Sequence, residues 1–538
     1  MQAQEIDTGD ALSGPVLATV AEDDRLDILL VVSPTNARSP HMPFYYLYLA
    51  GYMEERGYKV RIADPKSKSM QENLDHIYQQ IRETRPRFVG LAAFVTDFGV
   101  MCDLAKSIKK ISDAVVVVGN AHPSTNPEDF IHPGSDFDIA VRGEGEETLE
   151  DILELYKSPE DLNKIKGIAF LEDGKMISTP VRKFLEGEKW GRPAYHMLDM
   201  AFYARPSKYL IRTLYASCAI IYTARGCPFK CGFCAANAVW DANEQKGTPI
   251  VRNRPMDVVM EELRVLQDVY HFDFFYILDD TFGLRERDVK AFCEAYKKSG
   301  LKMLWAAETR VACIKNKEIL EILIDAGCIQ LDFGVETGAP HLLDTINKKI
   351  SVAQIKNAFT LCHETGMRSF ANMLINLPGE TEEDLDLTED LLDEIRPTYT
   401  SIGVTQPYPG TPFYSLAGFD IPKEDYGLLD REVPPENLRM AQHGLNLRKK
   451  LFEWQFKYGV YSAFPHSTYW PNWRFWKQIF RSKRKMQYLR YHIKTGITSF
   501  IIYLIRRKEY FVIARNPEKT VIRKRASWQL SHGKAPEQ

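Results

Sequence analysis

Short apolar runs alternate with segments of helical spacing over the first part of the chain. The runs lie at residues 26–32, 59–63, 87–92, 114–119 and 137–141, and helical spacing is clear from Phe44 to Arg56. Continuous apolar runs of this length are typical of parallel strands that are buried on both faces. The alternation therefore predicts a doubly wound, flavodoxin-like α/β sheet over residues 26–155.

The same alternation resumes at Ala216 and continues to about residue 415. Strands are expected at residues 219–223, 274–278, 303–307, 330–335, 370–376 and 400–405, with helices between them, as at 256–270 and 317–326. Six βα units are fewer than the eight of a closed barrel. We therefore expect a partial (β/α)6 barrel over residues 216–415, with its chemistry on the loops at the carboxyl ends of the strands.

Three other stretches lack this alternation. Residues 1–25 are polar and predict a flexible leader, whereas residues 156–215 predict a linker with a hairpin at the Asp173-Gly174 turn signal. Residues 416–538 predict a mainly helical region that is rich in aromatic and basic side chains. The leader lacks the basic and apolar segments of a secretory signal, and no long uncharged apolar run predicts a transmembrane helix. A cytoplasmic location is expected.

Charge is distributed unevenly along the 538 residues, although the formal net charge is only −3. From Pro471 onward the chain carries 17 Lys and Arg against three Asp and Glu. This tail has three interpretations: a helical cap over the barrel mouth with a solvated basic face, peripheral contact with an anionic membrane, or nucleic-acid binding. No recognised nucleic-acid module accompanies the charge, so no nucleic-acid partner is expected.

Small and polar residues follow several strands of the first predicted sheet. Ligands of doubly wound sheets bind at the carboxyl ends of the strands. The candidate binding residues at this edge are Ser33, Gly119, His122, Gly143 and Gly145. Small residues allow a bulky ligand to approach the backbone, although the same glycines also serve simply to make turns. No G-x-G-x-x-G follows the first strand, so a Rossmann dinucleotide site is not expected.

Three cysteines, Cys227, Cys231 and Cys234, follow the first strand of the predicted barrel. Zinc would need a fourth protein ligand to close a tetrahedral site, and the adjacent loop supplies no obvious one. A four-iron cluster held by three thiolates instead leaves one iron open to an exogenous ligand. We favour the cluster, with zinc or plain packing as alternatives. The six scattered cysteines are expected to be small packing residues: Cys102, Cys218, Cys293, Cys313, Cys328 and Cys362.

The C-x3-C-x2-C spacing, with Phe233 before the last cysteine, resembles the radical S-adenosylmethionine (SAM) superfamily. Later segments resemble that family in the same order: residues 275–282, 307–311, 333–338, 376–381 and 408–412. With the amino-terminal sheet added, the chain resembles the cobalamin-dependent branch, in which residues 119–123 and 142–146 are similar to corrinoid-domain signatures. The resemblance covers about residues 26–415.

This resemblance implies three cofactors: a [4Fe–4S] cluster, SAM and cobalamin. The three cysteines would hold the cluster, and Phe233 would pack near the adenine of SAM. Asp279 and Asp280 would lie near the methionyl amino group, and Arg310 and Glu336 would contact other polar parts of SAM. The alternative for each of these four polar residues is a turn or cap role. A paired acid and base at Asp279 and Asp280 is disfavoured, because adjacent residues on an extended chain usually point apart.

The cobalamin motif D-x-H-x-x-G, in which histidine ligates cobalt, is absent around the best-placed candidate, His41. Ser39 and Phe44 stand where the motif needs aspartate and glycine. We therefore expect cobalamin to bind without a histidine ligand, its nucleotide tail packed near residues 119–123 and 143–145. His122 is interpreted as a tail or loop contact and not as a cobalt ligand.

The resemblance implies transfer of a methyl group from SAM, through methylcobalamin, to an unactivated carbon or phosphorus of a small-molecule or lipid-like substrate. An external electron donor of the flavodoxin or ferredoxin type would reduce the cluster. Two alternatives remain. One is an oxidative cyclase or ring-rearranging enzyme with the same cofactors, and the other is a non-catalytic corrinoid sensor or carrier. The sequence does not identify the substrate or the acid and base residues.

Overall fold

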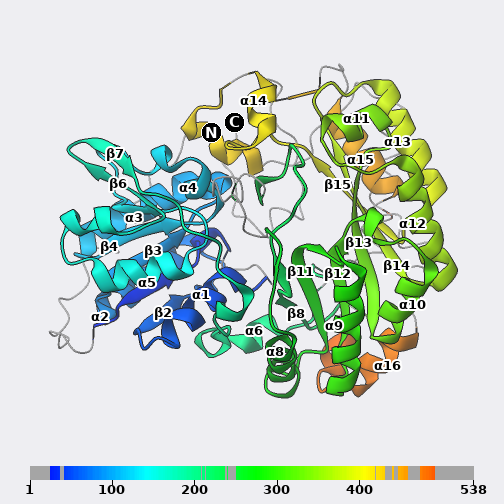
Figure 1. The fold of residues 1–538 in the computed structure, drawn as a ribbon, viewed down its shortest axis with the longest axis horizontal. Coiled ribbons are helices and arrows are strands. Elements are labelled where there is room, and N and C mark those ends of the chain that lie inside the picture. Colours follow the sequence, from blue (N-terminus) through cyan, green and yellow to red (C-terminus); the bar gives the residue numbers. More distant parts are fainter. Residues whose placement is uncertain are drawn as a thin grey trace.

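The computed structural model describes residues 25–36, 41–207, 209–211, 214–236, 239, 250–418, 420–430, 439–441, 446–458, 473–490, 493 and 504. Two α/β domains stand side by side, the first built on a mostly parallel sheet and the second on a fully parallel one (Figure 1). The predicted fold class, a doubly wound sheet followed by a partial barrel and further helices, is confirmed.

The first sheet has the strand order β2-β1-β3-β4-β5-β6-β7, in which β1 to β5 are parallel. Its strands are β1 Ile28–Val31, β2 Val60–Ala63, β3 Phe88–Ala92, β4 Val115–Gly119, β5 Ile139–Val141, β6 Ile168–Glu172 and β7 Lys175–Ser178. The predicted hairpin is β6 and β7. Because β6 pairs antiparallel with β5, the hairpin extends this sheet.

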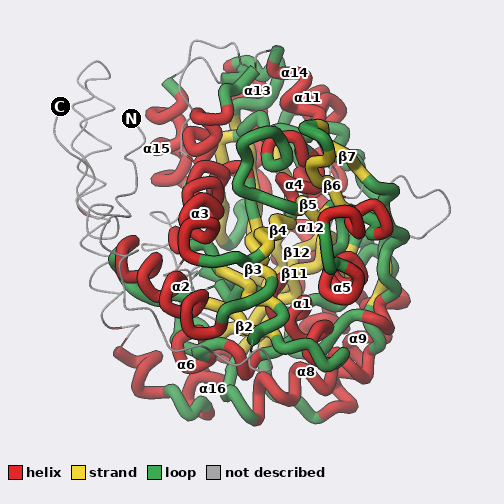
Figure 2. Tube along the Cα trace, turned by 90° about the vertical axis from the view of Figure 1, so that its left-hand side faces the viewer, coloured by secondary structure: helices red, strands yellow, loops and turns green. Residues whose placement is uncertain are grey.

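Helices cover both faces of the first sheet. They are α1 Phe44–Glu54, α2 Met70–Thr84, α3 Phe98–Ile111, the short α4 Ala121–Thr125 and α5 Glu146–Leu155. Leu74 of α2 and Met101 of α3 pack with Leu29 of β1 on one face of the sheet, the outer face. Figure 2 shows α2 and α3 together on this side of the strands. Leu47 of α1 and Ile152 of α5 pack on the opposite face. Their apolar cluster continues into the barrel, so the two domains share one core.

The second sheet is fully parallel, with the order β15-β14-β13-β12-β11-β8. Its strands are β8 Cys218–Ile221, β11 Phe274–Phe282, β12 Leu304–Thr309, β13 Cys328–Glu336, β14 Arg368–Ile375 and β15 Tyr399–Val404. β8 and β15 lie at opposite ends of this order, so the sheet forms an open partial barrel. A short antiparallel ribbon, β9 Ala224–Arg225 and β10 Arg252–Asn253, adjoins the cysteine loop.

The barrel helices begin and end at residues that the sequence marks clearly. These helices are α8 Met256–Asp268, α9 Glu286–Ser299, α10 Lys317–Asp325, α11 Pro340–Thr345, α12 Val352–Thr365 and α13 Glu382–Ile395. Ser351 and Thr381 cap the amino ends of α12 and α13 in capping boxes. Gly300 and Gly366 end α9 and α12 at φ of +72° and +71°, where a side chain would be strained.

The described residues that follow the barrel pack in several different places. α14 Pro412–Ala417 and the 3-10 segment Lys423–Asp430 return toward the first domain, where Tyr426 and Leu429 enter the outer core. α15 Leu447–Lys457 lies against α13, because Trp454 Nε1 donates to Glu389 Oε2 at 3.1 Å.

α16 Trp473–Arg481 and the residues after it pack at the amino ends of the barrel strands. Phe475 and Ile479 join Phe274 in one apolar cluster. Ser482 Oγ and the Tyr488 hydroxyl donate to Asp273 Oδ2 at 2.6 and 2.9 Å, directly before β11. The predicted cap over the barrel mouth is therefore wrong for residues 473–490, which close the opposite end.

Candidate cofactor site

The cysteine loop lies at the carboxyl end of the barrel sheet and is held from two sides. The Gly232 N–H donates to the Ile346 carbonyl at 3.0 Å, and the Phe413 N–H donates to the Gly232 carbonyl at 3.1 Å. A Cβ at Gly232 would stand 2.8 Å from the Phe413 ring, so only glycine allows this approach. Cys231 is buried, whereas Cys227 and Cys234 are partly exposed.

Arg310 brings a positive charge to the cysteine loop. Its Nη1 lies 3.8 Å from Cys231 Sγ, and its guanidinium carbon lies 3.7 Å from the centre of the Phe229 ring. Arg310 also donates to the Lys348 carbonyl. A fixed cation beside a thiolate stabilises negative charge, which suits a cluster bound by several thiolates.

The three thiols lie on one loop, separated by three and then by two residues. Among the described residues, no group of three His, Cys, Asp or Glu side chains is close enough to hold a single metal ion. A cluster does not require such closeness, because each thiolate binds a different iron. Cys227, Cys231 and Cys234 would thus hold three irons, and the fourth would be open to SAM.

Asp279 and Asp280 brace the backbone that leads into the cysteine loop. Asp279 Oδ1 accepts hydrogen bonds from the N–H groups of Thr223 and Ala224 at 2.7 and 3.0 Å. Burial raises the pKa of Asp279 to about 6, although these hydrogen bonds act in the opposite direction. Asp280 Oδ2 accepts from the Gly226 N–H at 2.7 Å. Both residues therefore make the contacts expected of a turn or cap role, which is the alternative to SAM binding. Their contact with SAM stays a prediction.

Phe233, Glu336 and Arg310, three of the predicted SAM residues, gather around Lys348. Lys348 Nζ pairs with Glu336 Oε1, and both side chains are under 10% exposed. Nζ also lies 5.6 Å from the centre of the Phe233 ring. Glu336 has φ +71°, a left-handed conformation that costs a non-glycine residue about 1–3 kcal/mol. A strained, buried ion pair at the end of β13 is typical of a functional site.

Sequence reasoning did not single out Lys348. It lies in a polar loop beside Asn347 and Lys349, where a lysine is ordinarily a solvated residue. Its partner, Glu336, is 12 residues earlier and on another element. A lysine among polar neighbours carries no local signal of burial, so only the fold reveals this pair.

The carboxyl edge of the first sheet carries small residues and a buried side-chain hydrogen-bond donor, the Asn120 amide. Gly143 has φ +84°, and its N–H donates to Ser124 Oγ at 3.0 Å. Ser33 Oγ lies 2.8 Å from Thr35 Oγ1. Asn120 has φ +90°, and its buried Nδ2 has no hydrogen-bond partner within the described part of the chain. An unpaired buried donor is costly, which fits an edge built to meet a polar ligand such as the cobalamin tail.

Gly119 and Gly145 stand at two further points of this edge. Gly119 ends β4, and Gly145 directly precedes α5. A Cβ at Gly119 would be 3.7 Å from the Val141 Cβ, and one at Gly145 would be 3.8 Å from Leu49. Both are ordinary contact distances, so the structure itself does not demand glycine there, and room for a ligand stays a prediction at both positions.

His122 is turned into the protein core and is only 1% exposed. Its Nε2 lies 2.7 Å from Asp129 Oδ2, and its ring packs against Phe98 and Phe130. Burial alone would raise the pKa of Asp129, but hydrogen bonds from His122 and Lys423 lower it below its usual range. In this arrangement His122 helps to hold the segment that returns from the barrel, and its predicted cobalamin contact stays untested.

Family models match both domains of the chain. The radical SAM superfamily model matches residues 221–392, and the B12 binding domain model matches residues 34–153. These matches cover most of the barrel and most of the doubly wound sheet.

Three curated relatives show what the chain is similar to. An uncharacterized methyltransferase of Pyrococcus horikoshii is 27% identical over 73% of this chain and 83% of its own length. The anaerobic magnesium-protoporphyrin IX monomethyl ester cyclase of Cereibacter sphaeroides is 26% identical over 73% of this chain, which spans 63% of that protein. The hopanoid C-3 methylase of Methylococcus capsulatus is 25% identical over 71% of this chain and 70% of its length.

Two solved structures share the fold at lower identity. TsrM of Kitasatospora setae, a radical SAM methyltransferase with cobalamin and a [4Fe–4S] cluster bound, has a TM-score of 0.59 and 19% identity, covering 73% of this chain and 75% of that one. The cobalamin-dependent SAM radical enzyme OxsB, with aqua-cobalamin and SAM bound, has a TM-score of 0.63 and 17% identity, covering 89% of this chain and 74% of that one.

The chain belongs to the cobalamin-dependent radical SAM enzymes. Its cofactors are a [4Fe–4S] cluster, SAM and cobalamin. It is an enzyme of the same kind as the radical SAM methyltransferases.

Proposed function

We propose that the enzyme transfers a methyl group from SAM, through cobalamin, to an unactivated carbon of a small molecule. One observation carries the proposal: the carboxyl ends of the two sheets meet. Gly410, beyond β15, approaches Thr125 of α4 so closely that a Cβ would stand 2.6 Å from the Thr125 side chain. Phe44 of the first domain and Tyr222 of the barrel place their ring centres 5.1 Å apart. A methyl carrier and a radical source would thus serve one shared space.

The residues assigned to this reaction bind and orient cofactors. Cys227, Cys231 and Cys234 would hold the cluster, which with SAM supplies hydrogen-atom abstraction, while cobalamin supplies a transferable methyl group. On the barrel side we assign the SAM contacts to Phe233, Asp279, Asp280, Arg310 and Glu336. On the sheet side we assign the cobalamin contacts to Ser33, Gly119, His122, Gly143 and Gly145. The catalytic acid and base are unassigned.

Product analysis under anaerobic conditions tests the proposal. Enzyme with cluster, cobalamin, SAM and a candidate substrate should form 5′-deoxyadenosine and S-adenosylhomocysteine together with methylated product. Turnover that yields deoxyadenosine without S-adenosylhomocysteine would contradict methylation and support an oxidative cyclase, which the cyclase relative makes the second candidate. Formation of neither product by corrinoid-loaded enzyme would indicate a sensor or carrier. The Cys231→Ala variant is the control, since it should form neither product.

A lipid-like substrate and peripheral membrane contact are a further part of the proposal. On α16 the side chains of Trp473 and Phe480 are 71% and 64% exposed, beside the basic residues Lys477 and Arg481. Exposed aromatic and basic residues on one helix favour an anionic bilayer surface. One relative is named as a hopanoid methylase. None of the described helices is long and apolar enough to span a membrane.

Liposome sedimentation tests this membrane contact. Vesicles that contain anionic lipid should bind the wild-type enzyme at low salt, and the double variant Trp473→Ser/Phe480→Ser should bind less. Equal binding of both proteins, or no binding by either, would contradict the role of α16. A lipid substrate would then lose this support. We also propose a cytoplasmic location. A flavodoxin or a ferredoxin is the proposed electron donor, and the test is whether such a protein can reduce the cluster in place of dithionite.

A further inference from the structure

Two arginines of the barrel reach two glutamates of the first domain. Arg225 of β9 donates from Nη1 to Glu146 Oε1 at 2.7 Å and to Glu144 Oε1 at 3.3 Å. Arg252 of β10 donates from Nη1 to both carboxylate oxygens of Glu144, at 2.9 and 2.7 Å. Arg225 and Arg252 stand opposite each other in the β9–β10 ribbon. The ribbon is therefore tied to the loop between β5 and α5 through Glu144 and to the first residue of α5 through Glu146, on the cobalamin side of the molecule.

These four charged side chains are largely removed from solvent. Arg225 and Arg252 are 15% and 6% exposed, and Glu144 and Glu146 are 11% and 6% exposed. The ring of Trp190 lies 4.3 Å from the Arg225 guanidinium carbon. A buried charge that loses its partner is strongly destabilised. The ion pairs consequently favour one position of the ribbon relative to the loop.

The same ribbon leads directly into the cluster loop. Only Gly226 separates Arg225 from Cys227. Gly226 has φ +96°, and a Cβ there would overlap the Ile250 carbonyl oxygen, so this turn is tightly enclosed. Its N–H is also fixed by Asp280. A displacement of Arg225 would therefore move the first cysteine of the cluster loop.

We infer that Glu144 and Glu146 are positioning residues for the cluster loop, acting through Arg225 and Arg252. The cobalamin-binding domain thereby determines where the cluster stands, in addition to holding its own cofactor. The inference rests on the cofactor set of the family and on the cysteine ligands, and it does not depend on whether the enzyme methylates or cyclises its substrate.

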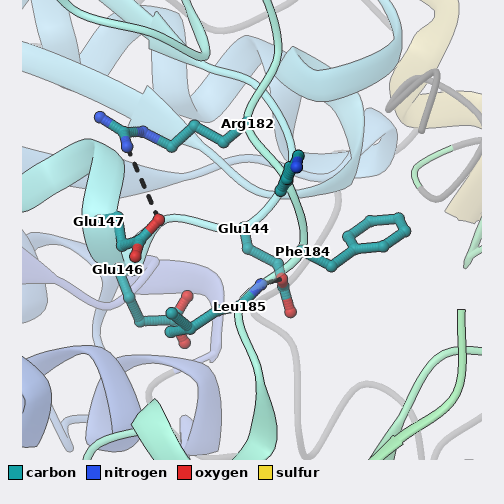
Figure 3. A pocket seen from close by; sticks show the side chains of 7 residues that line it. Glu144, Glu146, Glu147, Arg182, Phe184 and Leu185 are labelled. Atoms are coloured by element: carbon teal, nitrogen blue, oxygen red, sulfur yellow. Dashed lines mark hydrogen bonds and ion pairs between the residues drawn. The ribbon is translucent and has the colours of Figure 1, made fainter. Parts of the chain in front are cut away.

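The chain offers a matched control on the same helix. Glu147 follows Glu146 in α5, but its carboxylate faces Arg182 at 3.6 Å and is 37% exposed (Figure 3). Glu146→Gln and Glu147→Gln are equal changes in charge and size. Only Glu146→Gln removes the negative charge of a partner of Arg225.

The test compares these variants as holoenzymes, without substrate, by electron paramagnetic resonance (EPR) of the reduced cluster and by SAM cleavage with dithionite. We expect Glu146→Gln to retain iron and cobalamin, to change the SAM-dependent EPR signal, and to slow deoxyadenosine formation at least about tenfold. Arg225→Gln should act alike, and the double variant should be no worse than either single one. Glu147→Gln should match the wild type.

Two outcomes would overturn the inference. The first is a Glu146→Gln enzyme with the EPR signal and cleavage rate of Glu147→Gln, and the second is a double variant whose losses simply add. If Glu146→Gln does not fold, Glu146→Asp keeps the charge with a shorter reach, and an unchanged EPR signal in that variant would overturn the inference as well. Because no substrate is present, failure here is distinct from failure of the proposed methyl transfer.

Discussion

Arg310 stands 3.8 Å from the sulfur of Cys231, so a buried guanidinium faces the cysteine loop, which we propose holds the cluster. This contact joins the end of β12 to a residue 79 positions earlier. It gives the cluster loop a fixed positive neighbour, whose influence on the cluster can be measured directly.

Replacing Arg310 should make the cluster harder to reduce. One-electron reduction adds negative charge, which a nearby guanidinium stabilises. Arg310→Gln should therefore lower the reduction potential by roughly 100 mV, since about 59 mV corresponds to 1.4 kcal/mol for one electron. A redox titration followed by EPR measures this potential. The control is Arg285→Gln, at the exposed start of α9, and a potential in Arg310→Gln equal to that control would contradict the prediction.

Loss of a cluster cysteine should abolish cluster binding and spare the fold. Cys231→Ala should lack the visible absorbance of the cluster and most of its iron after anaerobic reconstitution. Cys362→Ala is the matched control, because Cys362 is buried in α12 and far along the chain from the cluster loop. The prediction fails if the two variants bind equal amounts of iron.

Breaking the ion pair of Glu336 and Lys348 should destabilise the protein. Lys348→Met leaves a buried carboxylate without its partner and should lower the free energy of unfolding by about 3–5 kcal/mol. The double variant Glu336→Gln/Lys348→Met should recover part of that loss. Lys298→Met provides the comparison, since Lys298 and Glu294 form an exposed pair worth at most about 1 kcal/mol. Urea denaturation of the cofactor-free proteins measures the free energy of unfolding of all three variants.

The buried carboxyl of Asp279 should make stability depend on pH. Its pKa is about 6 in the folded protein against an ordinary 3.8, so the folded state binds the proton more tightly than the unfolded state. Its contribution to stability is consequently present below pH 4 and is lost as the pH rises to 6, by about 3 kcal/mol at about 1.4 kcal/mol per unit.

The variant Asp279→Asn isolates this contribution, because asparagine resembles the protonated carboxyl and does not titrate. Denaturation of both proteins between pH 4 and pH 7 should show a fall for the wild type that the variant lacks. Parallel pH profiles of the two proteins would show that Asp279 titrates normally.

Cobalt should carry no nitrogen ligand from the protein. The EPR spectrum of bound cob(II)alamin should lack nitrogen splitting from an imidazole, and His122→Ala should leave that spectrum unchanged. The same variant should be less stable, because it removes the buried partner of Asp129. Nitrogen splitting that disappears in His122→Ala would reverse this prediction.

The positions of these strands along the chain could be predicted because buried parallel strands require continuous apolar runs, and each of these runs became a strand of one sheet or the other. The position of α16 could not be predicted in the same way. Its spacing indicates that one face is buried, but Phe475 and Ile479 would suit either end of the barrel equally.

The cysteines could be recognised because ligand spacing is local, whereas the residues around them could not. Arg225 and Glu146 are 79 positions apart and belong to different domains. No periodicity or motif links two such charges. The cysteine loop could thus be proposed from the sequence because one loop carries all three thiols, whereas the charges that the fold brings together from distant positions could not.

The return of the chain from the barrel to the first domain has a consequence for biosynthesis. Ile421, Tyr426 and Leu429 complete the outer apolar core of the first sheet, long after α5 has been made. At about 5–20 residues per second, a ribosome needs roughly 14–55 s to travel from the end of α5 to Leu429. The nascent amino-terminal domain therefore keeps part of its apolar surface uncovered until the barrel has been synthesised.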